Sequence, residues 1–351
     1  MLSAAFLGVV LAVTSPSPAP SPGQVTVQDK RITESSGLVA SPTHPGLVWT
    51  VNDSGSTAVV YGVSARTGRT LATLRLADTQ ARDWEAMTAT RDGEGQGLLW
   101  IGDVGDNRAV RDSVVLRLVR EPLRVSSQTL TPVSLRVRYP DGAHDVETLI
   151  WTPDGRLLLV SKDLFSGVVY QVPPPAVAAA LAGRSTLDSV VAVPLAQVAM
   201  SLVTDGAALP DGRIILRGYS QARIYPDPVV GGPLEPQQQV SLPAQPQGET
   251  LAVMDGGAAV LVGSEGVRQP LYRVALPAPS LAGSPSLAAS PSLAGFPSLA
   301  AAPSPAPSPS SGRAATAPTR AGSDPAPLLP IGAAAAVLAL AAIAQRRRRR
   351  T

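Results

Sequence analysis

The central part of the chain alternates short apolar runs with turn residues, and this pattern occurs five times. Each unit opens at an acidic residue, continues into an apolar run and ends in a turn that contains glycine. Asp-Gly between two apolar runs favours a tight hairpin because glycine tolerates positive φ angles. The five turns are Pro45-Gly46, Asp92-Gly93, Asp154-Gly155, Asp211-Gly212 and Asp255-Gly256.

Further strands are expected after each turn. The second run of each unit is almost entirely apolar, which is typical of a strand buried on both faces. These second runs cover residues 47–51, 98–102, 157–161, 214–218 and 260–263. Third runs follow at 59–63, 114–118, 168–172, 222–225 and 271–276. More polar fourth runs are visible at 70–76, 134–138, 190–193 and 239–242.

Four strands per unit, repeated about every fifty residues, predict the blades of a β-propeller. The fifth unit lacks a fourth strand, but residues 24–30 alternate in polarity and precede the first unit. We expect this segment to complete the last blade and to close the ring, which removes exposed sheet edges. The sequence therefore predicts an all-β, five-bladed propeller over residues 24–276, with a six-bladed propeller or a β-sandwich as the alternatives.

Both ends of the chain differ in composition from the centre. Residues 2–13 form an apolar run followed by Pro and Ser, which predicts a signal peptide and leader over 1–23. Residues 277–327 are rich in Pro, Ser and Ala, with a hexapeptide repeat that starts at Pro279, and such a composition predicts a disordered stalk.

The last segment predicts an anchor. Residues 328–344 are apolar or small, so we expect a transmembrane helix over 328–345 and a cytoplasmic arginine tail over 346–351. The propeller would then be extracellular, on a single-pass protein of the cell membrane. The alternative interpretation of the apolar run is an Ala-rich helix packed at the end of a soluble domain.

Composition excludes several classes of function. The chain has no cysteine and only two histidines, His44 and His144, so thiol chemistry and histidine-rich zinc sites are not expected. The formal charge of +3 includes the five arginines of the tail, and the rest of the chain carries −2. Nucleic-acid binding is therefore not predicted. We expect a monomer with an extracellular protein or a small molecule as its partner.

The acidic openings of the five units predict a ring of carboxylates at the mouth of the central channel. They are Glu34, Glu85, Glu147, Asp205 and Glu249. Further polar residues fall in loops expected at the same face: Asn52, Asp53, Asp83, Asp103, Asp106, Asn107, His144, Asp145, Lys162, Tyr219 and Glu265.

The carboxylate ring admits two interpretations. Clustered carboxylates attract hard cations such as Ca²⁺, which prefers six to eight oxygen ligands. The candidate metal ligands are Asp103, Asp106, Glu85 and Glu147. Alternatively, the acids cap strand ends or pair with Arg31, Arg82 or Lys162 and only hold the blades together.

Several motifs resemble those of secreted actinobacterial β-propeller proteins, which are loosely related to phytase-like, TolB-like and WD-repeat families. The motifs are Glu34-Ser-Ser-Gly-Leu, Trp49-Thr-Val-Asn-Asp, Asp83-Trp-Glu, Gly102-Asp-Val-Gly-Asp-Asn, Asp145-Val-Glu-Thr and Gln247-Gly-Glu. The resemblance implies a propeller, and for phytase-like members it implies calcium and phosphorylated substrates bound by acidic and basic channel residues. Here the acids are present and basic partners are few, which weighs against phosphate-ester hydrolysis.

Two function hypotheses follow. The first is a cell-surface binding or protein-interaction module, since propellers commonly present a rigid face to partners. The alternative is a calcium-dependent hydrolase (phytase-like, esterase or lactonase) with an acidic site at the channel mouth. Bound calcium and its effect on ester or lactone turnover distinguish the two hypotheses.

Overall fold

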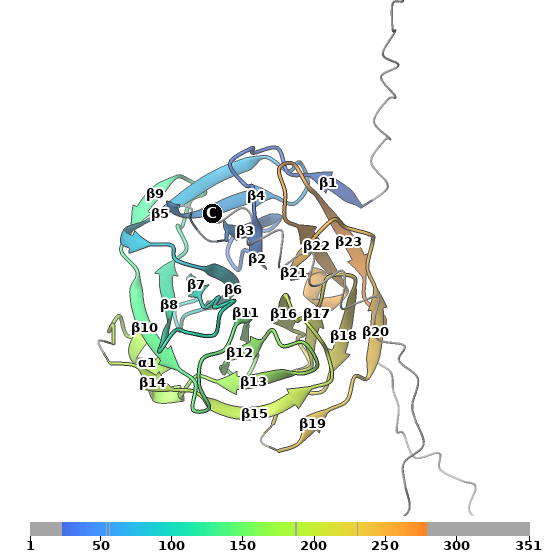
Figure 1. The fold of residues 1–351 in the computed structure, drawn as a ribbon. Coiled ribbons are helices and arrows are strands. Elements are labelled where there is room, and N and C mark those ends of the chain that lie inside the picture. Colours follow the sequence, from blue (N-terminus) through green and yellow to red (C-terminus); the bar gives the residue numbers. More distant parts are fainter. Residues whose placement is uncertain (1–22, 54, 56, 187, 230, 279–351) are drawn as a thin grey trace, which may run out of the picture. The chain divides into compact units, whose positions relative to one another are not determined.

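The computed structural model describes residues 23–53, 55, 57–186, 188–229 and 231–278. In this part of the chain, five sheets stand around a common axis as the blades of a propeller (Figure 1). The predicted five-bladed propeller is therefore confirmed, and the six-bladed and sandwich alternatives are wrong.

Each blade contains four antiparallel strands, and three blades carry a short fifth strand at the outer edge. Blade 1 contains β2 (Ser35–Ala40), β3 (Leu47–Asn52), β4 (Thr57–Ser64), β5 (Thr70–Gln80) and β9 (Gln128–Leu130). Blade 2 contains β6 (Trp84–Arg91), β7 (Gly97–Asp103), β8 (Val114–Arg120), β10 (Val133–Arg138) and β14 (Val190–Val191). Blade 3 contains β11 (Val146–Trp151), β12 (Leu157–Ser161), β13 (Gly167–Gln171), β15 (Val193–Val198) and β19 (Pro233–Leu234).

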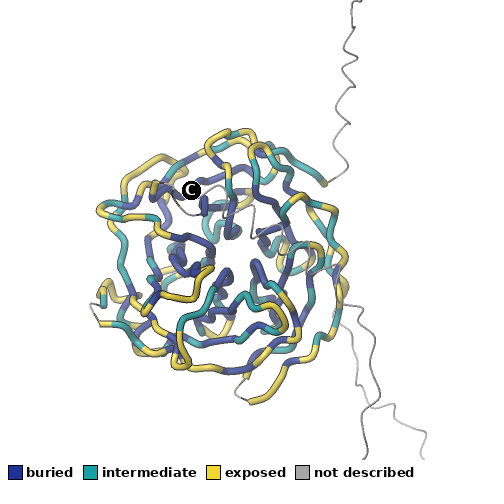
Figure 2. The backbone as a smooth tube through the Cα atoms, in the orientation of Figure 1, coloured by how far each residue is buried: buried dark blue, intermediate teal, exposed yellow. Residues whose placement is uncertain are grey.

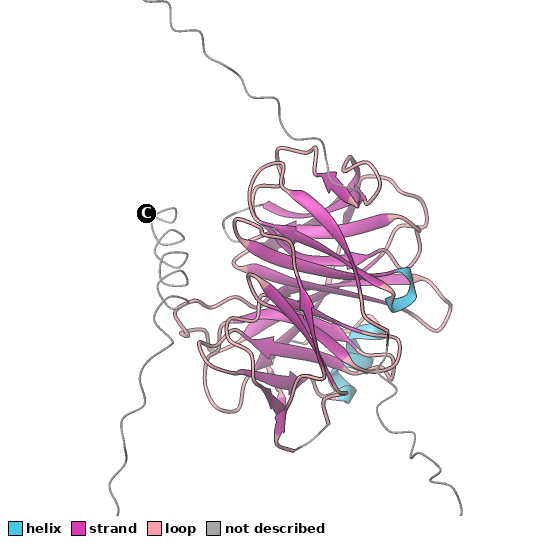
Figure 3. Ribbon diagram, turned by 90° about the vertical axis from the view of Figure 1, so that its right-hand side faces the viewer, coloured by secondary structure: helices cyan, strands magenta, loops and turns pink. Residues whose placement is uncertain are grey.

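The last two blades have four strands each. Blade 4 contains β16 (Asp205–Ala208), β17 (Ile214–Arg217), β18 (Gln221–Tyr225) and β20 (Gln238–Ser241). Blade 5 contains β21 (Gly248–Met254), β22 (Ala259–Ser264), β23 (Pro270–Ala275) and β1 (Gln24–Thr26). Two helical segments, α1 (Pro174–Leu181) and η1 (Asp255–Gly257), lie at the same face of the ring when it is viewed from the side (Figure 3).

The amino-terminal strand closes the ring as predicted. β1 pairs in antiparallel register with β23, with Val25 opposite Leu271. The innermost strands β2 and β21 are also in contact, so the first and last units meet directly. Closure leaves no open gap between blades 5 and 1, and the last sheet receives its fourth strand from the start of the domain.

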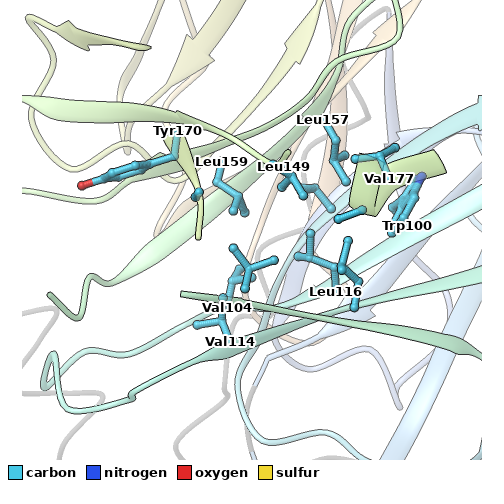
Figure 4. Close-up of a cluster of buried hydrophobic side chains, with 14 of the residues drawn as sticks. Trp100, Val104, Val114, Leu116, Leu149, Leu157, Leu159, Tyr170 and Val177 are labelled. Atoms are coloured by element: carbon cyan, nitrogen blue, oxygen red, sulfur yellow. The ribbon is translucent and has the colours of Figure 1, made fainter. Parts of the chain in front are cut away.

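The hydrophobic core is divided among the interfaces between blades. The described apolar side chains form five clusters, and each cluster joins two neighbouring blades. In the cluster between blades 2 and 3, Trp100 and Leu116 face Leu149, Leu157 and Leu159 (Figure 4). The inner strands are therefore covered on both sides (Figure 2), which explains their nearly continuous apolar sequence.

One predicted strand belongs to another blade. Residues 190–193 were expected as the fourth strand of the third unit, but β14 pairs in parallel with β10 of blade 2. The fourth strand of blade 3 is β15, which pairs with β13. β9 and β19 likewise reach back to the outer edge of the preceding blade. Such strands of two or three residues are too short to show a period, so sequence cannot assign them to a sheet edge.

The predicted end segments lie almost wholly outside the described residues. This concerns the signal peptide and leader (1–23), the stalk (277–327), the transmembrane helix (328–345) and the tail (346–351). Within the described part of the chain, no helix has the length and apolar character needed to cross a bilayer.

Candidate functional site

The inner strands of three blades carry a glutamate at their second residue, at a β-bulge. The pairing register of β6, β11 and β21 shifts around Glu85, Glu147 and Glu249, respectively. Such a β-bulge inserts one residue and redirects its side chain. All three residues are completely buried, so their carboxylates lie in the interior and not on the outer surface.

The first blade departs from this pattern. Glu34 precedes β2 and is half-buried, while the register shift of β2 falls after Ser36. Ser36 therefore lies directly before the residue that the shift of β2 leaves unpaired, Gly37, whereas in the next blade Glu85 is itself the unpaired residue. Ser36 and Glu85 both precede a small residue and then an apolar one, Gly37-Leu38 and Ala86-Met87, and an alignment on that pair would have identified Ser36 from sequence.

Asp205 of the fourth blade contacts the inner strands of two other blades. Its carboxylate accepts backbone hydrogen bonds from Leu251 at 2.7 Å and from Gly206 at 2.8 Å. It also interacts with the backbone N–H of Leu38, so one side chain connects blades 4, 5 and 1. Burial raises the pKa of Asp205 well above 3.8, and the backbone hydrogen bonds oppose this shift.

Three buried acids converge where blades 1 and 2 meet. Asp53 follows β3, Asp83 precedes β6 and Glu85 lies on β6, and one carboxylate oxygen of each lies within 4.8 Å of the others. The exposed fractions of the three residues are 3%, 7% and 0%, respectively. All three were predicted to lie at the mouth, and of the four predicted metal ligands this group contains only Glu85.

Gly105 forms the wall behind this acidic cluster. A Cβ atom at position 105 would lie 2.7 Å from Cγ of Asp83 and 2.7 Å from Cγ of Glu85. The backbone N–H of Gly105 also donates to the carbonyl of Asp83 at 3.2 Å. The loop after β7 can therefore approach the two acids only because position 105 has no side chain.

Asp103 and Asp106 hold the loop in which Gly105 lies. The guanidinium of Arg111 pairs with Asp103 at 3.0 Å, and both side chains are 4% exposed. Asp106 accepts the backbone N–H groups of Val110 at 2.7 Å and of Arg111 at 2.6 Å. Asp145 accepts the backbone N–H of Asp106 at 2.7 Å, which ties this loop to the third blade.

A second polar group lies around the third, fourth and fifth blades. Lys162 donates to Glu147 at 2.6 Å, with side chains 6% and 0% exposed. The Lys162 ammonium also lies 5.2 Å from the ring centre of Tyr219, where cation–π attraction is favourable. Burial raises the pKa of Tyr219, and the nearby carboxylates of Glu249 and Glu147 add to the increase.

Arg217 and Gln247 organise the adjoining loops, and neither was among the predicted site residues, although Gln247 opens one of the quoted motifs. The fully buried guanidinium of Arg217 donates to the carbonyls of Thr250 at 2.8 Å and Gly263 at 3.1 Å. Burial lowers the pKa of Arg217 to about 10, against the opposing effect of the nearby Glu249 and Asp205. The Gln247 amide donates to Glu249 at 3.2 Å and to Glu265 at 2.6 Å.

The remaining predicted residues are held in local networks or exposed. Asn52 accepts the backbone N–H of Thr33 at 3.1 Å and donates to the carbonyl of Arg31 at 2.7 Å. Asn107 is exposed. Nε2 of His144 lies 2.9 Å from the hydroxyl of Tyr170. Tyr170 belongs to β13, the third strand of its blade, so this contact does not involve the inner strand.

Comparison with known proteins leaves the family open. The chain matches no family model, and no curated protein is similar to it. Among solved structures, glutaminyl cyclase from Myxococcus xanthus has a TM-score of 0.40 at 12% identity, covering 72% of this chain and 98% of that one.

Two further solved structures are similar at the same level. Regucalcin from Agrobacterium tumefaciens, a calcium-binding protein, has a TM-score of 0.38 at 12% identity, covering 71% and 94% of the two chains. A gluconolactonase from Xanthomonas campestris has a TM-score of 0.37 at 11% identity, covering 66% and 69%. TM-scores below 0.5 at 11–12% identity identify neither a family nor an activity, so the site is interpreted from its own residues.

Proposed function

We propose that the protein is a calcium-dependent hydrolase of small esters or lactones, with its active centre at the acidic mouth of the propeller. The observation that carries this proposal is the convergence of the Asp53, Asp83 and Glu85 carboxylates within 4.8 Å of one another. Three carboxylates this close repel one another, and a divalent cation offsets two of the three negative charges.

The donor set suits calcium better than a softer metal. Hard carboxylate oxygens are the ligands that Ca²⁺ prefers, whereas zinc sites use cysteine and histidine. Asp53, Asp83 and Glu85 would hold the ion, and Gly105 leaves room for the last two side chains behind it. A bound Ca²⁺ would polarise a substrate carbonyl as a Lewis acid.

The chain also supplies groups for the rest of such a reaction. Lys162, held between Glu147 and Tyr219, would supply the positive charge that attracts the oxygen gaining charge during ester cleavage. Glu147 fixes the position of that ammonium through the 2.6 Å contact. Lys162 is thus our candidate for orienting the substrate.

The test combines metal binding with turnover on the purified protein. We expect calorimetry to show one Ca²⁺ per chain, with a Kd of roughly 10⁻⁴ to 10⁻³ M as in extracellular calcium modules. EDTA should abolish hydrolysis of a panel of short esters and lactones. Asp83→Asn and Glu85→Gln should lose both properties, while Asp255→Asn, an exposed acid on the η1 turn, should retain them.

Three results would decide against this function. Absence of Ca²⁺ binding in the wild-type protein would overturn it, as would turnover that EDTA leaves intact. Ca²⁺ binding without turnover on any substrate would instead favour the interaction module considered from the sequence. Export and anchoring in the cell membrane remain proposals that rest on residues 1–23 and 328–345, and fractionation of cells with an antibody to the propeller tests them.

A further inference from the structure

Ser36 contacts the acidic cluster from the neighbouring blade. Its hydroxyl lies 2.8 Å from Oε2 of Glu85 and 3.1 Å from the main-chain carbonyl oxygen of Glu85, and it can donate its hydrogen to either. Ser36 is 1% exposed and Glu85 is fully buried, so solvent does not compete for this contact. A hydrogen bond to a buried carboxylate is stronger than one between neutral groups.

The backbone holds Ser36 at this distance. Gly37 has a φ of +69°, and a Cβ atom there would lie 2.6 Å from the backbone nitrogen of Met87. The register of β2 also shifts between Ser36 and Leu38, which marks a bulge at this point. The inner strands of blades 1 and 2 therefore touch directly beside Glu85, and this contact, not a long flexible side chain, brings the hydroxyl to the carboxylate.

We propose that Ser36 is a positioning residue for the cation site, which sets the orientation of the Glu85 carboxylate. The terminal torsion of a glutamate side chain is soft, so a carboxylate without a partner at Oε2 rotates over a broad range. With Oε2 held by Ser36, the plane of the carboxylate is set relative to Asp53 and Asp83. Hydrogen-bond partners of metal ligands act in this way in many proteins. The inference rests on the proposed function.

Ser35 provides a matched control. It lies next to Ser36 on β2 and is also buried, at 6% exposure, but its hydroxyl bonds to that of Thr50 at 2.8 Å. Ser35→Ala and Ser36→Ala thus remove the same atom and one buried hydrogen bond at adjacent positions. Ser36→Cys keeps the volume at position 36 and replaces the hydroxyl by a weak donor, which guards against a folding defect of the alanine variant.

The experiment measures Ca²⁺ affinity by calorimetry and thermal unfolding in EDTA for the wild-type protein and the three variants. We expect Ser36→Ala and Ser36→Cys to weaken Ca²⁺ binding about tenfold, the usual size for a hydrogen-bond partner of a ligand. Ser35→Ala should lower the unfolding temperature in EDTA and leave the Ca²⁺ affinity unchanged. If the hydroxyls had only a structural role, all three variants would have a lower unfolding temperature and none would have a changed Ca²⁺ affinity.

The possible failures are distinguishable. If the wild-type protein and Ser35→Ala bind Ca²⁺ and both position-36 variants bind it equally well, the positioning inference is overturned and the proposed function stands. A loss of affinity in Ser35→Ala as large as in the position-36 variants also overturns it, since any buried hydroxyl of β2 would then suffice. If the wild-type protein binds no Ca²⁺, both proposals are wrong.

Discussion

Asp205 accepts a 2.7 Å hydrogen bond from the backbone N–H of Leu251, so a side chain of the fourth blade is fastened to the inner strand of the fifth. The same carboxylate interacts with the backbone of Leu38 in the first blade. It is one of five acids that the sequence placed in a single ring, yet its surroundings are entirely those of a structural group. The inner strands are held together here by a buried carboxylate and not by apolar contacts alone.

The first prediction concerns the pH dependence caused by Asp205. Because burial raises its pKa well above 3.8, its contribution to stability is fully present below that value and is lost as the pH rises through the folded-state pKa. We therefore expect Asp205→Asn to make the free energy of unfolding less dependent on pH above 4. Urea unfolding of both proteins at a series of pH values measures this difference, and parallel pH profiles would contradict it.

Asp205→Ala should be more severe than Asp205→Asn. Alanine leaves the N–H groups of Leu251 and Gly206 without the acceptor they have in the wild-type protein. Each buried donor left without a partner costs about 1–3 kcal/mol, so we expect a loss of about 3 kcal/mol or more. Asparagine retains one acceptor oxygen and should fall between alanine and the wild-type residue.

A second prediction concerns a buried acid away from the mouth. Glu121 follows β8, is fully buried and accepts the indole N–H of Trp49 at 2.6 Å and the backbone N–H of Thr43 at 3.1 Å. Glu121→Ala should lower the free energy of unfolding by about 3 kcal/mol, because it leaves hydrogen-bond donors of the first blade without their acceptor. Glu121→Gln keeps one acceptor and should cost less in the same urea titration. Equal losses would show that the acceptor is not what matters.

The third prediction uses the close approach of Gly105 to Asp83 and Glu85. Gly105→Ala would place Cβ 2.7 Å from Cγ of each acid, so the acids or the loop must move. We expect a loss of about 1–3 kcal/mol in stability, as for other overpacked sites, and weaker Ca²⁺ binding. Gly93→Ala is the control, since a Cβ at position 93 meets no atom within 4 Å. An unchanged Ca²⁺ affinity in Gly105→Ala would show that this loop does not contribute to Ca²⁺ binding.

The fourth prediction tests closure of the ring. Removing residues 1–27 deletes β1 and the buried Val27, and it exposes the outer edge of β23. Burial of one valine contributes about 1.5–3 kcal/mol, so the unfolding temperature should fall by roughly 5 °C. The exposed strand edge should also promote association, which size-exclusion chromatography detects. Removing residues 1–22 leaves β1 in place and should have neither effect.

The number of blades could be predicted from the sequence because each blade repeats the same local pattern of apolar runs and turn residues. A buried strand needs an apolar run and a hairpin needs Gly at a positive φ, as at Gly155 and Gly212, and both signals lie within a few residues. The pairing of the amino-terminal strand with the last unit also followed, because a closed ring leaves no unpaired edge there.

From the sequence, the candidate site is only a set of residues expected at one face. The sequence placed Glu85, Glu147, Asp53 and Asp83 at the mouth, because each falls at the start of an inner strand or in a loop on that side. Which of them meet depends on how two separate blades pack. The bulge at Gly37 brings Ser36 against Glu85, although 49 residues separate the two in the chain.

What the sequence by itself determined is therefore the repeat, the strands and the ring that they close, since these follow from short-range patterns of polarity and turn residues. Only the tertiary structure decided that Asp53, Asp83 and Glu85 form one cluster, that Lys162 pairs with Glu147, and that Asp205 connects the fourth blade to the fifth and the first. The physical reason is that a side chain's partners across two blades depend on bulges and close backbone contacts, which redirect a carboxylate without leaving a periodic signal in the chain.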